Sequence, residues 1–430
     1  MIHRSSFPKW LSILLIAASA LFILIGISIS FFNPRSIQQP TPNLMAPAIT
    51  DTNTPEPAPA ATSVLVGSPL PTTRQEFFPT HYPAVTFRKG PYLTFTGDNS
   101  QMEVIWQVEE TTLSTIEWGT TEQYQNGSAT TSEYTMDHLH RYIISDLSPG
   151  TKYHYRVIVG DGEAGGTFYA RPDSTATDLK FFVYGDTRDG TMIHDQITGA
   201  IRSAYTADPA FQTFILATGD LVDDGDLDWM WDRQLFAPLF PDLRTAFADL
   251  AFLPVMGNHD GDGTLFMKYF PMPFVDYRYW SFDYGPAHIV MLDQYTPYKE
   301  GTDQYKWLEN DLKANNKNWK FIVMHMPGWS ASENNLGVQG SIISLAEQNG
   351  VSAVFAGHNH YYARAEVNGV THITAGGGGA PLYAPNPNAP NVVTTKMAHG
   401  FVEISIQGDL LNGIAYDIDG NTIDRFLINR

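Results

Sequence analysis

From residue 178 onward the chain alternates short apolar segments with amphipathic ones, and this alternation restricts the fold more than any other feature. Five apolar segments of four to six residues have the length and composition of strands that are buried on both faces. They are residues 179–184, 214–218, 253–256, 321–324 and 351–356. Helical patterns lie between them, as in Tyr305, Leu308 and Leu312, which are spaced i, i+3 and i+7. The sequence therefore predicts an α/β (α+β) domain, which we assign to residues 175–430.

Polar residues directly follow each of the five predicted strands. The segments are Gly185-Asp186-Thr187-Arg188, Gly219-Asp220-Leu221-Val222-Asp223, Gly257-Asn258-His259-Asp260, His325-Met326-Pro327 and Gly357-His358-Asn359-His360. In α/β sheets, ligands bind at the carboxyl ends of the strands, so these side chains could converge on one site. Each segment alone is better explained as an ordinary turn. Five such segments, each after a strand, favour a common site.

The side chains in these segments are carboxylates, an amide and imidazoles, which suit Mn, Fe and Zn better than soft metals. Two metal ions about 3.5–4 Å apart can clamp a phosphate, lower the pKa of a bridging water and stabilise the leaving oxygen. A nearby histidine can supply a proton to the departing alcohol. We therefore expect a centre of two divalent or trivalent metal ions (Fe, Mn or Zn) that acts on a phosphate ester.

Residues 82–172 show a different pattern, in which short alternating runs are separated by Gly, Asn, Asp and Pro. In one run, Val104, Trp106 and Val108 fall on one face of a strand. About 90 residues of this kind predict a small β-sandwich, which we assign to residues 81–174. Its sequence contains no obvious cluster of histidines or carboxylates, so we expect a spacer or packing module.

The N-terminus carries an uncharged run of 23 residues, Trp10–Phe32. As a helix rising about 1.5 Å per residue, this run would span a bilayer core of roughly 30 Å. Arg4 and Lys9 precede it and favour an N-terminus in the cytoplasm. We expect a cell-membrane anchor over residues 1–32, with a cleaved signal segment and a secreted protein as the alternative. Residues 33–80 are rich in Pro, Thr and Ala and predict a disordered linker that leads to domains outside the cytoplasm.

The net charge of the chain excludes one class of partner and leaves another open. It is -19, from 45 acidic and 26 basic residues. Nucleic acids are bound by patches of Lys and Arg, so we expect no nucleic acid partner. A small anionic substrate remains possible, because bound metal ions can reverse the local field. The chain has no cysteine, which excludes disulfides, thiolate metal sites and cysteine nucleophiles.

In this order, the five polar segments resemble the motifs of the calcineurin-like metallophosphoesterase superfamily, and within it the purple acid phosphatase branch. The segment Ser145–Tyr153 is similar to the fibronectin type III-like domain that precedes the catalytic domain in this branch. The loop Gly376–Tyr383 is similar to a late loop of the same branch. The resemblance covers about residues 82–430. It implies a catalytic domain of two packed β-sheets flanked by helices, preceded by an all-β immunoglobulin/fibronectin-like sandwich.

The resemblance also implies a set of metal ligands at the matching positions. The carboxylate of Asp220 would bridge both ions. The other expected ligands are Asn258, His325 and His358 for the second metal, and Asp186 and His360 for the first. These side chains come from all five polar segments, so the implied ligand set requires all five to meet.

Two departures from the family pattern concern the first metal. Many members have a histidine where this chain has Arg188, and purple acid phosphatases have a tyrosine where it has Asp223. The first metal then lacks its usual fourth protein ligand, and Asp223, His194 or water could fill the place. Arg188 is suited to gripping the phosphate, because its planar fork matches two oxygens. His259 resembles the catalytic histidine of the family, and Asp260 could orient it.

Three functions follow from this interpretation. The first is acid phosphatase-like hydrolysis of a phosphomonoester by direct attack of a metal-bound hydroxide. The second is phosphodiesterase activity at the same site, since diester choice depends on the shape of the pocket. The third is a non-catalytic surface binding protein on a decayed phosphoesterase scaffold. In the first two cases the substrate would be a small-molecule or polymer phosphate ester.

Overall fold

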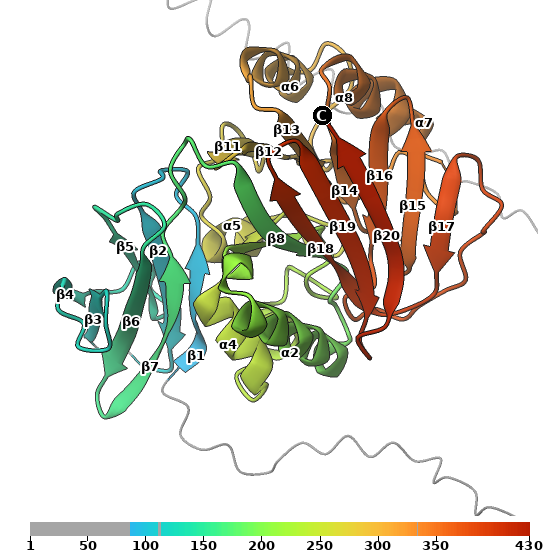
Figure 1. The fold of residues 1–430 in the computed structure, drawn as a ribbon. Coiled ribbons are helices and arrows are strands. Elements are labelled where there is room, and N and C mark those ends of the chain that lie inside the picture. Colours follow the sequence, from blue (N-terminus) through green and yellow to red (C-terminus); the bar gives the residue numbers. More distant parts are fainter. Residues whose placement is uncertain (1–86, 111–112, 333) are drawn as a thin grey trace, which may run out of the picture. The chain divides into compact units, whose positions relative to one another are not determined.

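The fold was obtained as a computed structural model, and the structure describes residues 87–110, 113–332 and 334–430 (Figure 1). The chain divides into two compact units at Phe77, and all of the described residues belong to the second one. The predicted anchor and linker lie outside the described residues. Among the residues that are described, no helix is long and apolar enough to cross a bilayer.

A seven-stranded sheet forms one half of the catalytic core (Figure 1). Its strands, in spatial order, are β11 (Trp280–Tyr284), β12 (Ala287–Met291), β13 (Trp319–Val323), β14 (Ala353–Ala356), β16 (Val370–Ala375), β15 (Tyr362–Val367) and β17 (Val392–Lys396). Strands β12, β13, β14 and β16 run parallel to one another, so their carboxyl ends lie at the same edge.

A nine-stranded sheet forms the other half. Its order is β20 (Thr422–Asn429), β19 (Leu410–Asp417), β18 (Gly400–Gln407), β8 (Asp178–Tyr184), β9 (Phe214–Ala217), β10 (Ala251–Pro254), β1 (Phe87–Thr94), β2 (Met102–Val108) and β5 (Leu139–Ile144). Strands β8, β9 and β10 are parallel neighbours. Strand β1 pairs in parallel with β10, where Leu93 lies opposite Ala251. The first strands of the chain therefore extend the sheet of the catalytic domain.

The predicted N-terminal sandwich is present, but it is less separate than the sequence pattern suggested. A four-stranded sheet, made of β4 (Gly127–Thr131), β3 (Ser114–Gly119), β6 (Lys152–Val159) and β7 (Gly162–Tyr169), forms its second layer. Trp106 of β2 connects the layers, since its buried indole N–H donates to Ser114 Oγ at 3.2 Å. The Tyr155 hydroxyl of β6 donates to Ala248 O of the catalytic domain at 2.9 Å.

The two large sheets pack on each other and are covered by helices on their outer faces (Figure 1). Phe181 of β8 contacts Phe321 of β13, with ring centroids 5.6 Å apart. The seven-stranded sheet is covered by α6 (Asp303–Ala314), α7 (Leu336–Val338), η3 (Gln339–Ile343) and α8 (Ser344–Gln348). The remaining helices are α2 (Thr191–Ala207), η1 (Pro209–Phe211), α3 (Asp228–Met230), η2 (Trp231–Phe236), α4 (Pro241–Asp249) and α5 (Thr264–Tyr269). This layering agrees with the two packed sheets that were expected.

The five predicted strands correspond to β8, β9, β10, β13 and β14. Strands β9, β10 and β14 are buried throughout, and β8 and β13 are buried except at Asp178, Lys180 and Lys320. The predicted helix is also present as α6, where Leu308 and Leu312 are buried and the Thr302 side chain caps the first turn. Because β8, β9 and β10 belong to one sheet and β13 and β14 to the other, the site is built where the carboxyl ends of both sheets meet.

Candidate metal centre

Four donor atoms from four strand-end loops meet around His325. The distance from His325 Nε2 is 3.1 Å to Asn258 Oδ1, 3.2 Å to His358 Nδ1 and 3.3 Å to Asp220 Oδ1. Asn258 Oδ1 is 2.9 Å from His358 Nδ1. Donor atoms that share one ion at about 2.0–2.2 Å lie roughly this far apart. The spacing therefore fits a single metal position.

The hydrogen bonds of His325 indicate that the lone pairs of these ligand atoms point towards one another. His325 Nδ1 lies 2.8 Å from Thr218 O, and a carbonyl oxygen only accepts. The ring proton therefore sits on Nδ1, and Nε2 presents a lone pair to the oxygens of Asn258 and Asp220. Lone pairs repel at this distance unless a cation lies between them, so the residues present fit a bound metal ion.

A second group of donors adjoins the first. His360 Nε2 lies 3.6 Å from Asp186 Oδ1, while His360 Nδ1 is 2.9 Å from Pro381 O and so carries the proton. Asp186, Asp220 and His325 each offer one ligand atom, and these three atoms lie within 4.8 Å of one another. The structure thus places the six expected ligands in two adjacent groups, with Asp220 between them.

The backbone at these ligands adopts unfavourable conformations. Asp186, Asp220 and His358 have φ angles of 59°, 53° and 67°, in the left-handed region that non-glycine residues rarely adopt. Each such residue costs of the order of 1–3 kcal/mol and persists where the surroundings enforce it. The neighbouring glycines permit close approach, since a Cβ atom on Gly357 would lie 2.2 Å from Asp186 Oδ2. Three strained ligands in one place indicate a functional site.

The electrostatics of the site favour added positive charge. Asp186 is fully buried, and burial together with the neighbouring Asp220 raises the pKa of Asp186 well above its usual value. Burial lowers the pKa of His358 to about 4 and also lowers the pKa values of His325 and His360. The imidazoles are therefore neutral near pH 7 and available as ligands. The carboxylates lack compensating charge from them, which a metal ion would supply.

His259 lies beside this centre and is partly exposed. Its backbone N–H donates to Asp220 Oδ1 at 2.9 Å, which ties the residue to the metal loop. Its ring Nδ1 is 2.8 Å from Asp223 O, so the proton sits on Nδ1 and Nε2 is left available. This arrangement is compatible with a histidine that exchanges a proton with a substrate.

Asp260 does not contact the His259 ring as the sequence interpretation suggested. Its buried carboxylate accepts hydrogen bonds from four backbone N–H groups, those of Gly257, Asp220, Leu221 and Val222. Burial raises the pKa of Asp260 to about 7. Asp260 therefore joins the loops after β9 and β10, and any effect on the His259 ring is indirect.

Arg188 and Asp223 form an ion pair beside the shared Asp220. Arg188 Nη1 lies 2.7 Å from Asp223 Oδ1, and Arg188 Nε lies 3.5 Å from Asp220 Oδ2. The Asp223 carboxylate is thus engaged by a cation and is half-exposed, unlike the buried Asp186. His194 lies elsewhere, because its Nε2 bonds the Tyr184 hydroxyl at 2.9 Å within the core. His194 therefore does not lie among the donors, and the Asp223 carboxylate is paired with Arg188.

The glycine-rich loop Gly376–Tyr383 forms part of the wall of the site. The sequence did not predict that this loop packs against Asp186. Ala380 N donates to Asp186 O at 2.8 Å, and a Cβ atom on Gly376 would lie 2.9 Å from Asp186 Oδ2. The Tyr383 ring lies 5.3 Å from that of His360, and its hydroxyl donates to Asn359 Oδ1. Four consecutive glycines were the only signal that a backbone must approach another segment closely here.

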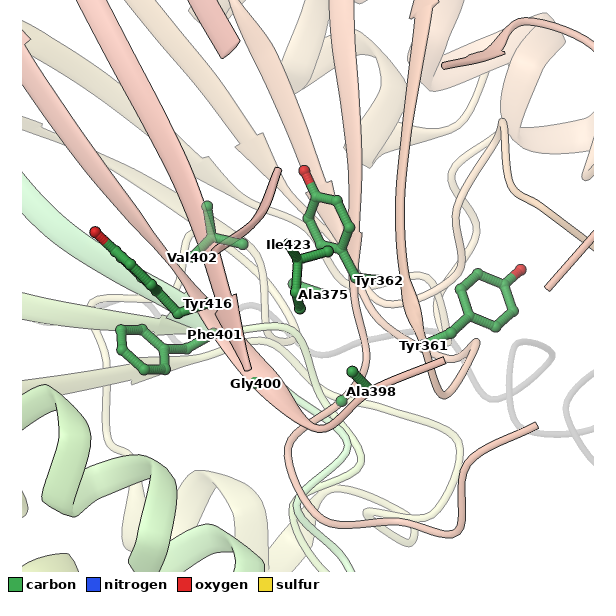
Figure 2. Close-up of a pocket in the computed structure, with 10 residues that line it drawn as sticks. Tyr361, Tyr362, Ala375, Ala398, Gly400, Phe401, Val402, Tyr416 and Ile423 are labelled. Atoms are coloured by element: carbon green, nitrogen blue, oxygen red, sulfur yellow. The ribbon is translucent and has the colours of Figure 1, made fainter. Parts of the chain in front are cut away.

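A small cavity lies behind the strand ends (Figure 2). Figure 2 shows Tyr361 and Tyr362, adjacent in sequence, with side chains that leave the chain in different directions near Ala375. The cavity measures about 10 Å³, which is room for about one water molecule. A phosphate ester would not fit in this cavity.

Comparison with known families agrees with this architecture. The family model described as "Calcineurin-like phosphoesterase" matches residues 179–362. The model described as "Purple acid Phosphatase, N-terminal domain" matches residues 89–175. The chain therefore combines a calcineurin-like phosphoesterase domain with the N-terminal domain of purple acid phosphatases, which is the organisation of a purple acid phosphatase-like metallophosphoesterase.

Individual relatives point to the same branch. Probable purple acid phosphatase 20 of Arabidopsis thaliana is 28% identical over 385 residues, which cover 78% of this chain and 87% of the relative. Fe(3+)-Zn(2+) purple acid phosphatase 12 of the same plant is 25% identical over 348 residues, covering 69% and 73%. The structure of purple acid phosphatase PPD1 from yellow lupin (Lupinus luteus) seeds has the same fold, with a TM-score of 0.67, 18% identity and coverage of 80% and 75%.

Proposed function

We propose that this protein is a phosphomonoesterase that uses a binuclear metal centre at the strand ends. The observation that carries the proposal is the convergence of lone pairs around His325, together with a second donor group that shares Asp220. A site built from neutral imidazoles and buried carboxylates attracts cations, and cations attract phosphate. A phosphate ester is also the substrate class of the family.

The donor set suggests which residues would hold the ions. One ion would be held by Asp220, Asn258, His325 and His358, and the other by Asp186, His360 and the shared Asp220. Oxygen and imidazole donors suit Fe, Mn or Zn, and the chain has no thiolate that would select a softer metal. When bound, two such ions neutralise phosphate charge and lower the pKa of a coordinated water.

The remaining groups of the site would act on the ester itself. His259 Nε2 would exchange a proton with the leaving oxygen, because Nδ1 is held by the carbonyl of Asp223. Arg188 would add a fixed positive charge for the phosphate oxygens, although its ion pair with Asp223 reduces that charge. Asp260 would hold the loop of Asp220 and the loop of His259 together through its hydrogen bonds to their backbone N–H groups.

A second candidate is a phosphodiesterase at the same site, with cyclic nucleotides, lipid headgroups or wall polymers as possible substrates. The site is open on the side of Asn258, which is exposed, so a second ester group could be accommodated there. A non-catalytic binding protein is the third candidate. The departures at Arg188 and Asp223 favour it, and the presence of the other donors argues against it.

We further propose that the catalytic domain, residues 175–430, acts outside the cytoplasm. The proposal rests on the apolar run Trp10–Phe32, its basic flank and the linker 33–80. The sandwich, residues 81–174, would then stand between the linker and the catalytic domain.

The function can be tested on the compact unit Phe78–Arg430. We expect it to release phosphate from an aryl phosphate monoester at least about 10-fold faster than it cleaves the matching aryl diester, once Mn, Fe or Zn is supplied. A chelator should abolish both reactions. Faster diester cleavage would favour the phosphodiesterase. A protein that binds no metal and cleaves neither ester would favour the binding protein.

A further inference from the structure

The two donor groups of the metal centre are unequal. The group around His325 contains four donor atoms. They are His325 Nε2 itself and three others that lie within 3.3 Å of it. Among the described residues, the group around Asp186 consists of Asp186, His360, whose Nε2 is 3.6 Å from Asp186 Oδ1, and the shared Asp220. Affinity rises with the number and charge of the ligands, so the group around Asp186 should hold a metal ion less tightly than the group around His325.

A permanent cation lies beside the weaker group. Arg188 Nε is 3.5 Å from Asp220 Oδ2, the oxygen of Asp220 that does not face His325. A guanidinium remains charged at all relevant pH values. A metal ion placed next to Asp220 Oδ2 would therefore be repelled by Arg188.

Asp223 limits this repulsion. Its carboxylate binds Arg188 Nη1 at 2.7 Å, and its backbone N–H donates to Gln234 Oε1 at 2.7 Å, which fixes the residue. Only 17% of the Arg188 side chain is exposed, compared with 44% for Asp223. Solvent therefore screens the carboxylate more than the guanidinium, and a net positive charge remains at the weaker group.

We propose that the two metal positions differ in affinity and that the Arg188–Asp223 pair sets the affinity of the weaker position, at Asp186 and His360. The inference rests on the proposed binuclear centre. It assigns Asp223 a role other than that of a metal ligand: the carboxylate moderates the charge of Arg188.

The test is a Mn²⁺ titration of the metal-free, full-length chain in detergent, with free Mn²⁺ measured by its electron paramagnetic resonance. We expect two steps, with the first ion bound at least about 10-fold more tightly than the second. Arg188→Met should tighten the second step about 10-fold without changing the first, and Arg188→Lys should restore the wild-type value. Two equal steps in the wild-type protein would overturn the inference.

Variants of Asp223 separate a charge effect from direct ligation. Asp223→Asn should weaken the second step in the wild-type background and have no effect on it in the Arg188→Met background. If Asp223→Asn weakens the step equally in both backgrounds, Asp223 is a ligand and the inference is wrong. Arg156→Met is the matched control, because Arg156 also pairs with a carboxylate, Glu117 at 2.7 Å, but lies in the four-stranded sheet.

Ester hydrolysis, measured on the same samples, keeps the two proposals distinct. Hydrolysis together with two equal binding steps would overturn the inference and leave the proposed function intact. Unequal steps without hydrolysis at any Mn²⁺ concentration would support the inference about the metal positions and overturn the proposed function.

Discussion

Two of the places where the described part of the chain buries charge are the junction between β1 and η2 and the metal centre. At the junction, Lys89 is fully buried, and its Nζ pairs with Asp232 and donates to Gln107 Oε1 at 2.5 Å. The same ammonium group lies 4.5 Å from the centroid of the Tyr269 ring. Every partner of this charge belongs to the protein, so the junction needs nothing from solution.

The metal centre differs in this respect. Asp186 is equally buried, but within the described part of the chain the hydrogen bonds to its carboxylate come from the backbone N–H of His358, at 2.9 and 3.0 Å. The side chains beside it are the neutral His360 and a second carboxylate, Asp220. A buried charge whose partners are all present is tolerated by the fold, and removing one partner destabilises it. A buried charge without them marks a place where the chain depends on an added cation.

The largest expected effect comes from removing the shared carboxylate of the metal centre. Asp220→Ala should abolish tight metal binding and lower phosphate ester turnover by at least about 1,000-fold, because both donor groups lose a ligand. Metal content by elemental analysis and hydrolysis of an aryl phosphate measure the two effects.

Asp232→Ala is the matched control at the junction. It should keep its metal and most of its turnover per folded molecule while losing stability, because Asp232 serves Lys89 and Arg88. If Asp220→Ala retained metal and activity, the metal centre would not depend on an added cation, and the contrast with the junction would fail.

Much of the fold could be predicted from the sequence, because the relevant signals are local. The five buried strands and the helix α6 follow from apolar periodicity, and their positions agree with the structure within a few residues. The pairing of β1 with β10 could not be predicted in this way. It joins Leu93 to Ala251, which are far apart in the chain, and no periodicity specifies which strand edge a distant strand will meet.

The site was predictable to a similar degree. Residue type and position after a strand identified Asp186, Asp220 and His325, which the structure brings together. The partners of Asp260 and Asp223 were not predictable, because both depend on loop conformation. A carboxylate directly after His259 suggested a contact with that ring, but the loop turns Asp260 towards backbone N–H groups instead.

The next largest effect concerns His259. His259→Ala should lower turnover about 100- to 10,000-fold, which is the usual contribution of a general acid or base. Metal content should stay at the wild-type level, because the ring contacts the Asp223 carbonyl and no donor of the metal centre. A variant that lost metal and turnover together would show that His259 belongs to the ligand set.

Lys89→Met tests the junction from its other side. Removing one partner of a buried ion pair costs about 3–5 kcal/mol of unfolding free energy, and the exposure of Asp232 places this pair at the lower end, about 3 kcal/mol. Urea denaturation of the metal-loaded protein measures the loss. Turnover per folded molecule should not change. An equal fall in metal content would indicate that the junction and the centre are coupled.

The smallest effect is a pH dependence at the junction. Burial lowers the pKa of Lys89 from 10.5 to about 8. Between these values the unfolded chain still holds a proton that the folded chain has released, so the unfolding free energy should rise with pH. Below pH 8 both states are protonated and the contribution is constant. The difference between wild type and Lys89→Met in urea denaturation should therefore grow above pH 8, by at most about 1.4 kcal/mol per pH unit. A difference that stays constant up to about pH 10.5 and falls above it would mean that Asp232 outweighs burial and raises the pKa of Lys89.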